Sequence, residues 1–278
     1  MRWAVLAGLV AAQPAWADEG LTDFLGGQGC TIGAESSAAA RDAGFTSAQI
    51  LALAEAALAS GNAARHGNYV VLDADICTIG LPQIPSRYTV DTPDIRAASP
   101  YIREVYDLGG TETVDEGCFL GGGSDLFRSL EGGDPKAGFE AYMAFIGSGL
   151  IAGDLRFYEI SPLKTPAGFQ IMTGEACAAV ANADDIARSH AFIDSGFADY
   201  VRFVGANTPC GENVTFQATQ YIAQMQGFDF DRDLLDQPRI NAWLALEFDF
   251  ITRAAGWYEG MTDTDRGAPR PPLCHVPS

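Results

Sequence analysis

Apolar residues recur at steps of three and four in three separate parts of the chain. The first part covers residues 46–60, where the apolar positions fall on one side of a helix. These positions are Ile50, Leu53, Ala54, Ala57 and Leu58. Thr46, with Gln49 three residues later, has the pattern of a capping box, and Gly61 stands where a left-handed C-cap is expected. The pattern predicts an amphipathic helix with a defined start and end.

Shorter signals flank this helix on both sides. An alanine-rich helical stretch, residues 34–43, precedes it and stops at a Gly-Phe pair. After the helix, residues 63–65 and 69–72 flank the short segment His66, Gly67 and Asn68, which suits a turn between two strands. The predicted order is therefore two helices followed by a β-hairpin.

The same order returns twice with different residues. In the second copy the helix positions are Phe139, Met143, Ile146 and Leu150, followed by Gly153. In the third copy they are Leu244, Phe248, Ile251 and Ala255, followed by Gly256. A hairpin is expected after each helix, from residues 157–160 and 169–172 in the second copy and from Trp257 onward in the third.

Six cysteines fall as three successive pairs, one pair around each copy. Six cysteines permit about 15 connectivities, and the repeated order of elements selects one of them. That connectivity joins Cys30 to Cys77, Cys118 to Cys177, and Cys210 to Cys274. In the chain-entropy model each bridge would stabilise the fold by roughly 4 kcal/mol.

These elements predict an α+β fold that is mainly helical. Their order resembles a winged-helix module, in which the second helix and the hairpin usually contact the partner. We expect three tandem, disulfide-closed modules, over residues 18–90, 91–182 and 183–278. The proline-rich connection after the first copy should be partly extended, with a short helix at residues 101–108. Residues 184–204 should form a helix ahead of the third copy.

The first 17 residues have the pattern of a cleavable export signal. Arg2 gives a positive start, residues 3–12 are apolar, and Ala15 and Ala17 form a small-x-small cleavage site. The apolar run is about ten residues long, whereas a membrane span needs roughly 20. We therefore expect cleavage after Ala17 and a soluble, secreted chain, in the periplasm or outside the cell, where disulfides form and persist.

The charge of the chain argues against nucleic acid as a partner. There are 36 acidic and 17 basic residues, a formal charge of −19, and loss of Arg2 with the signal changes it from −19 to −20. A surface of this kind repels phosphate backbones. In the first copy, residues 46–60 contain no Lys or Arg, and the hairpin offers only Arg65 and His66. Any winged-helix contact is thus expected to be with protein or a cell-surface polymer.

Acidic residues in the third copy raise the question of a calcium site. The candidates are Asp229, Asp231, Asp233 and Asp236, with Asp263 and Asp265 as a second group. An EF-hand needs glycine at the sixth position of its loop and glutamate at the twelfth, where this chain has Leu234 and Ile240. A solvated acidic turn is the preferred interpretation, and a weak calcium site of another kind is the alternative. No other cofactor is expected.

Glu247 and Asp249 are the candidates for catalysis. They lie in the most aromatic predicted helix, and a carboxyl group in an apolar pocket can have a raised pKa and act as a general acid. However, residues two apart point about 200° apart on a helix, so the pair does not converge by local geometry. Asp249 could instead pair with Arg253, four residues later. A structural role is the simpler interpretation.

Two functions from different classes follow. The favoured one is a non-enzymatic repeat protein of the cell envelope that binds another protein or a cell-surface polymer. The alternative is a periplasmic glycan or peptidoglycan hydrolase with a carboxylic acid, Glu247 or Asp249, in the third module. Repetition and the absence of convergent catalytic motifs favour the first, and the aromatic helix motivates the second.

Overall fold

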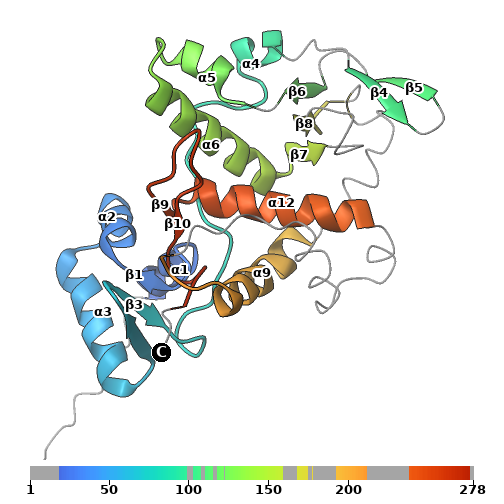
Figure 1. Cartoon of the computed structure of the whole chain (residues 1–278). Coiled ribbons are helices and arrows are strands. Elements are labelled where there is room, and N and C mark those ends of the chain that lie inside the picture. Colours follow the sequence, from blue (N-terminus) through green and yellow to red (C-terminus); the bar gives the residue numbers. More distant parts are fainter. Residues whose placement is uncertain are drawn as a thin grey trace, which may run out of the picture.

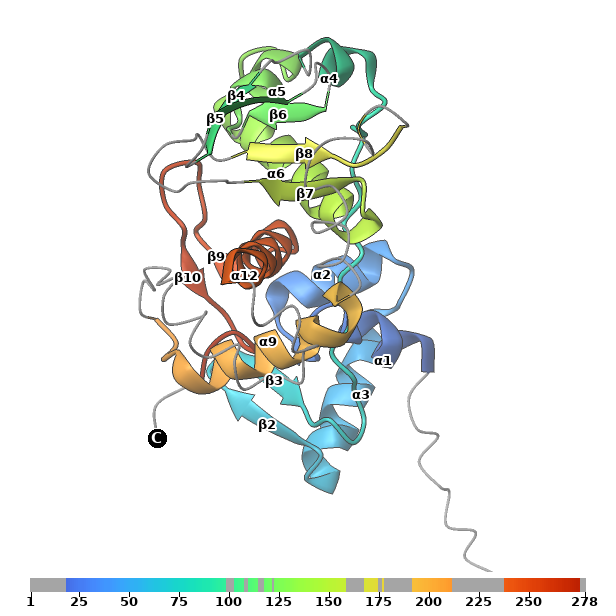
Figure 2. The ribbon, with the colours of Figure 1, turned by 90° about the vertical axis from the view of Figure 1, so that its right-hand side faces the viewer.

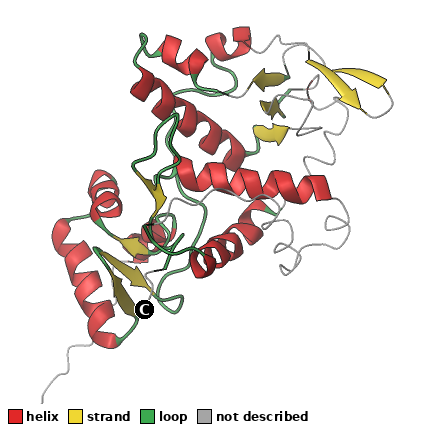
Figure 3. Cartoon of the chain, in the orientation of Figure 1, coloured by secondary structure: helices red, strands yellow, loops and turns green. Residues whose placement is uncertain are grey.

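The computed structural model describes residues 19–98, 103–107, 110–114, 118–121, 123–158, 168–174, 177, 192–211 and 238–275. Helices and small antiparallel sheets alternate along these residues, as Figure 3 shows. The mixed, mainly helical class predicted from the sequence is therefore correct. Among the described residues, no helix combines the length and apolar character needed to cross a membrane.

The first part of the chain forms a compact group of three helices and three short strands (Figure 1). In order they are α1 (Glu19–Gly26), β1 (Thr31–Ile32), α2 (Ala34–Asp42), α3 (Ser47–Ser60), β2 (Ala63–His66) and β3 (Tyr69–Leu72). The strands form one antiparallel sheet in the order β1-β3-β2. The predicted order of two helices and a hairpin is confirmed, with a short strand added before the helices.

Local signals account for the limits of α3. The Thr46 hydroxyl accepts a hydrogen bond from the Gln49 backbone N–H at 3.2 Å, and the Gln49 side chain accepts one from the Thr46 N–H at 2.8 Å. Gly61 ends the helix with a φ of 79°, a conformation that glycine adopts readily. His66 pairs with Tyr69, so it belongs to strand β2 and not to the turn where the sequence placed it.

A second group repeats this order (Figure 2). Its elements are α4 (Pro93–Ala98), β6 (Phe119–Gly121), α5 (Asp125–Leu130), α6 (Pro135–Ala152), β7 (Leu155–Tyr158) and β8 (Gly168–Ile171). The sheet order is β6-β8-β7, which matches β1-β3-β2 strand for strand. Asp134 caps α6 by accepting from the N–H groups of Lys136 and Ala137. Gly153 ends α6 with a φ of 86°, as predicted.

Between α4 and β6 the chain forms a hairpin that the sequence did not predict. Strands β4 (Arg103–Asp107) and β5 (Gly110–Val114) pair antiparallel, with Asp107 opposite Gly110. The short helix expected at residues 101–108 is therefore wrong. Val105 and Tyr106 are residue types that favour strands, and glycines follow at positions 109 and 110, a pattern that suits a hairpin better than a helix.

The third part of the chain is described in its helices α9 (Ile193–Asn207) and α12 (Pro238–Ala254) and its strands β9 (Tyr258–Glu259) and β10 (Ala268–Pro269). Helix α9 confirms the helix expected ahead of the third copy from residue 193 onward, and residues 184–191 lie outside the described residues. The strands pair antiparallel, and Pro209 forms an isolated bridge with His275. Figures 1 and 2 both show α12 lying between α6 and α9.

One backbone hydrogen bond recurs in all three parts. In each, the residue after the helix-ending glycine accepts a hydrogen bond from the N–H of the residue that follows the last strand. The three pairs are Asp73 N to Asn62 O at 2.9 Å, Met172 N to Asp154 O at 2.9 Å, and Arg270 N to Trp257 O at 3.0 Å. The three hairpins are thus closed in the same way against the ends of their helices.

The three disulfides join the pairs that the repeated order selects: Cys30 to Cys77, Cys118 to Cys177, and Cys210 to Cys274. Cys30 and Cys118 directly precede the first strand of their sheets. Their carbonyls accept hydrogen bonds from Leu72 and Ile171, the last residues of β3 and β8. Each of these two bridges therefore links the first strand of a sheet to the segment that follows the last strand.

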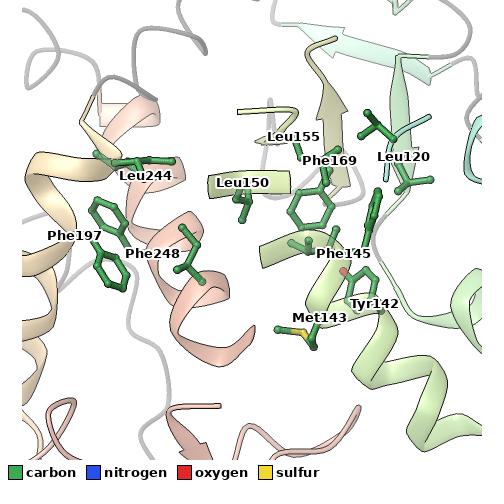
Figure 4. Packing of buried hydrophobic residues seen from close by; sticks show 14 of the residues in the cluster. Leu120, Tyr142, Met143, Phe145, Leu150, Leu155, Phe169, Phe197, Leu244 and Phe248 are labelled. Atoms are coloured by element: carbon green, nitrogen blue, oxygen red, sulfur yellow. The ribbon is translucent and has the colours of Figure 1, made fainter. Parts of the chain in front are cut away.

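The buried apolar residues of the described chain fall into two clusters. One belongs to the first group of elements, from Leu21 to Cys77. The other is shared by the second and third groups, and Figure 4 shows side chains from α6, β7, β8, α9 and α12 within it. Helices α6 and α12 come close because Gly147 faces Ala254, where an added Cβ would lie 2.4 Å from the alanine Cβ.

The first group is fixed against the third by small residues and by a buried arginine. A Cβ added to Gly29 would lie 2.5 Å from the ring of Pro272, so the Gly29 backbone packs directly against that ring. Arg270, which is 2% exposed, donates to the carbonyls of Pro271 at 2.9 Å and of Gln28 at 3.5 Å. Its guanidinium also lies 5.7 Å from the centre of the Trp257 ring. Burial lowers the pKa of Arg270 from its ordinary value.

Candidate binding cleft

A cleft of about 940 Å³ opens where the three groups of elements meet. The first group contributes the start of α2 and the β2–β3 turn, the second the first two turns of α6, and the third the end of α12 with the loop that follows it. The lining residues that matter below are Glu35, Tyr69, Lys136, Phe139, Glu140, Met143, Arg253, Tyr258, Glu259, Met261 and Asp263. Because all three groups supply residues, the cleft exists only when they are assembled.

The floor of the cleft is apolar. Phe139, Met143 and Tyr258 are buried there, and Tyr69 and Met261 are half-buried. Phe139 and Met143 lie in α6, whose other apolar positions pack into the shared core. Phe139 and Met143 therefore have two roles: they belong to the core that holds α6 in place, and they form the base of the cleft.

The rim of the cleft is charged, and mainly acidic. Glu35, Glu140, Glu259 and Asp263 are exposed, whereas Lys136 is the exposed cation. Lys136 lies 3.8 Å from Glu140, one helical turn away, and both side chains remain largely in solvent. An exposed pair of this kind contributes little to stability and leaves both groups accessible to a ligand.

Arg253 is the second basic residue of the lining, and it is half-buried. Its guanidinium lies 5.7 Å from the centre of the Phe250 ring, and its Nε donates to the sulfur of Met261 at 3.5 Å. Burial lowers its pKa from the ordinary value. Arg253 thus packs along the wall of the cleft and does not balance the acidic rim.

A hydrogen bond joins the first and third groups at the edge of the cleft. The Tyr69 hydroxyl donates to the Glu259 carboxylate, linking β3 to β9. Burial raises the pKa of Tyr69, and the bond to Glu259 raises it further. A second tyrosine forms a similar bond away from the cleft. The Tyr88 hydroxyl, in the segment that joins the first two groups, donates to the Glu131 carboxylate at 2.6 Å, and this bond raises the pKa of Tyr88.

These two tyrosines predict a loss of stability at alkaline pH. Their folded-state pKa values lie above the ordinary value of 10.0, so the stability they contribute is present below pH 10 and is lost as the pH rises through the folded-state values. Unfolding by denaturant at about pH 8 and about pH 11 should show this loss. Tyr69→Phe should have a smaller difference between the two conditions than the parent protein, and an equal difference would contradict this assignment.

Glu247, the first candidate for catalysis, lies in the core and not in the cleft. Its carboxylate is 3.9 Å from the Arg156 guanidinium, and both side chains are 1% exposed. Arg156 in β7 also donates to the carbonyls of Leu150 at 2.8 Å and Leu155 at 2.7 Å. The pair connects α12 with the β6-β8-β7 sheet, and it is closed to solvent and to any polymeric substrate.

Asp249, the second candidate, forms its ion pair with Arg266 in the loop between β9 and β10. The expected pair with Arg253 is therefore replaced by a long-range one, because the loop folds back over α12. Tyr258 donates to Asp249 at 3.4 Å, and the Arg266 guanidinium lies 5.3 Å from the centre of the Tyr258 ring. Asp249 thus holds Tyr258 in position, and Tyr258 in turn lines the cleft.

Only two of the calcium candidates, Asp263 and Asp265, lie within the described residues. Asp229, Asp231, Asp233 and Asp236 lie outside the described residues. Asp265 accepts a hydrogen bond from the Gly267 N–H at 2.9 Å, which makes it part of a tight turn with Thr262. Within the described part of the chain, no three His, Cys, Asp or Glu residues gather as a metal site would require.

Sequence reasoning did not find the cleft. The residues that line it are separated by up to 229 positions, from Ala34 to Asp263, and none belongs to a recognisable motif. Glu259 and Asp263 are visible in the sequence as acidic residues, but nothing local places them in one cleft with Glu35. Comparison with known protein families, with curated proteins and with solved structures finds no match to this chain.

Proposed function

We propose that the protein is an exported, acidic, disulfide-stabilised scaffold of the cell envelope that binds a partner in the cleft between its three groups of elements. The observation that carries this proposal is the composition of the cleft: an apolar floor with an exposed charged rim, assembled from all three groups. Binding sites commonly lie where domains meet and combine an apolar base with a few polar groups.

We further propose that the chain consists of three tandem modules of winged-helix order. The matching sheet orders β1-β3-β2 and β6-β8-β7 support this, as does the hydrogen bond that closes each of the three hairpins. The outward face of α3 carries Glu55 but no basic residue. A module of this kind suits contact with protein better than contact with nucleic acid.

Export is supported by the three disulfides, since such bridges persist in oxidising compartments and are rare in the cytosol. The proposed export signal, residues 1–17, lies outside the described residues. Location in the periplasm or beyond it therefore remains part of the proposal.

The hydrolase alternative has less support. A general acid must reach the bond that it protonates, and Glu247 is enclosed by the core beside Arg156. Asp249 is held by Arg266 beneath the cleft floor. Both carboxylates have structural partners, which favours the binding protein over the enzyme.

Affinity capture from envelope extract tests the proposed function. The oxidised, signal-cleaved protein should retain a specific partner, and Glu140→Trp should lose it, because the indole would block the rim at an exposed position of α6. Glu55→Trp is the matched control, because Glu55 is also an exposed glutamate on a helix and does not line the cleft.

Retention by Glu55→Trp together with loss by Glu140→Trp would support the cleft as the binding site. Loss by Glu55→Trp alone would contradict it and move the contact to α3. Equal retention by both variants would also contradict it. Circular dichroism of each variant should match that of the parent protein, so that a loss of binding is not a loss of fold.

A further inference from the structure

We infer that the ligand of the cleft is a basic polypeptide segment, one that presents Lys or Arg side chains between apolar residues. This inference rests on the proposed function and narrows it from any protein or polymer to a ligand of one chemistry. It depends on three features of the cleft: the balance of charge on its rim, the nature of its floor, and its size.

The rim carries an excess of negative charge. Its four acidic residues, Glu35, Glu140, Glu259 and Asp263, stand against Lys136 and Arg253, a difference of two charges. Within the described part of the chain, no ion pair at the cleft includes Glu35, Glu259 or Asp263. These three carboxylates are exposed, so a cationic ligand could pair with them at little desolvation cost.

Among the described residues, the basic groups nearby form no ion pair with these three carboxylates, although the buried charge of Arg270 attracts Glu35 and Glu259. Arg253 is packed against Phe250 and Met261, and Arg266 is paired with Asp249. Arg270 lies behind the cleft and is 2% exposed, with its guanidinium directed to backbone carbonyls. The net charge of the whole chain, −19, would add a long-range attraction for a basic partner.

The floor suits the rest of such a ligand. Lys and Arg have long apolar stems that pack on hydrophobic surface while their charged ends stay in water. Phe139, Met143 and Met261 offer such a surface, and the acidic rim stands beside it. The half-buried ring of Tyr69 is an aromatic face within reach of a cation, an arrangement that contributes some attraction of its own.

The size of the cleft favours a segment over a single small cation. Its volume of about 940 Å³ lies near the upper end of the range of about 300–1,000 Å³ for sites that enclose drug-sized ligands. A polyamine would satisfy the rim but would leave much of the apolar floor uncovered. Anionic partners, including phospholipid headgroups, would be repelled by the same carboxylates.

Fluorescence anisotropy with a labelled eight-residue peptide of alternating Arg and Leu tests the inference. The parent protein should bind this peptide, and binding should weaken as salt is added. The triple variant Glu35→Gln, Glu259→Gln, Asp263→Asn should bind it about tenfold more weakly. Glutamine at position 259 keeps an acceptor for the Tyr69 hydroxyl, so the link between the groups is retained.

The matched control changes the same total charge away from the cleft. The control variant is Asp42→Asn, Glu55→Gln, Asp75→Asn, three exposed residues of the first group that do not line the cleft. It should bind the peptide within about twofold of the parent. Lys136→Glu provides a test in the opposite direction, because it adds a carboxylate to the rim and should tighten binding by about threefold. A peptide of alternating Glu and Leu should not bind.

Equal weakening by the two triple variants would overturn the inference, because it would mean a general attraction to an acidic surface. Equal affinity for spermidine and for the Arg-Leu peptide would overturn it too, since the floor would then have no role. If the capture experiment finds a partner that depends on the cleft but the peptide does not bind, the proposed function stands and this inference falls. If neither is observed, both fall.

Discussion

Replacing Glu247 with leucine is expected to lower the free energy of unfolding by about 3–5 kcal/mol. The carboxylate lies 3.9 Å from the Arg156 guanidinium, and both groups are in the core. Without it, the Arg156 charge would remain buried without its ion-pair partner, held by the carbonyls of Leu150 and Leu155 and by the weaker attraction of Asp154. Burial already lowers the pKa of Arg156, which shows that its charge is costly to enclose. Guanidinium unfolding followed by circular dichroism measures the change.

The double variant Arg156→Met, Glu247→Leu separates the ion pair from the packing around it. Replacing a buried pair by apolar residues of similar size is often close to neutral, so this variant should recover most of the lost stability. Glu55→Leu, at an exposed position of α3, should change the stability by less than about 0.5 kcal/mol. A double variant as unstable as Glu247→Leu alone would mean that the pair is not coupled.

Removing the Cys118–Cys177 disulfide is expected to destabilise the shared core by about 4 kcal/mol. The bridge spans a sequence separation of 59 residues, and both cysteines are buried in the cluster shared by the second and third groups. Cys118→Ala, Cys177→Ala avoids placing new hydroxyl groups in that core. Differential scanning calorimetry should show a large fall in the transition that belongs to this cluster.

The Cys30–Cys77 bridge provides the comparison, because it belongs to the separate cluster of the first group. Cys30→Ala, Cys77→Ala should lower the unfolding transition of the first group and affect the shared core much less. Two separate transitions are a departure from two-state unfolding, which calorimetry detects directly. If the two disulfide variants lower the same single transition by equal amounts, the division into two cores is incorrect.

Local signals in the sequence predicted much of the secondary structure. The capping box of Thr46 and Gln49 and the glycines after α3, α6 and α12 mark helix limits that the structure reproduces. Each of these signals acts through contacts within four residues, so no knowledge of the rest of the chain is needed. The cysteine pairs were predicted from the repeated order of elements expected along the chain, and the structure has these three disulfides.

Interactions between distant residues could not be predicted in this way. The β4–β5 hairpin was missed because residues 101–108 were interpreted as a short helix, whereas residues 103–107 pair with residues 110–114. Asp249 has Arg253 one turn away, yet it pairs with Arg266, which only the folded loop brings near. The cleft is a stronger case, since Glu35 and Glu259 line it from two different groups and no pattern along the chain relates them.

Site-specific photo-crosslinking in intact cells tests most directly whether the cleft is the binding site. A benzoylphenylalanine residue would replace Lys136, whose side chain is 85% exposed on the rim, and separately Glu55 on α3. We predict a discrete crosslinked partner from position 136 and none from position 55. A partner crosslinked from position 55 alone, or from neither position, would contradict the claim that this protein acts through its cleft.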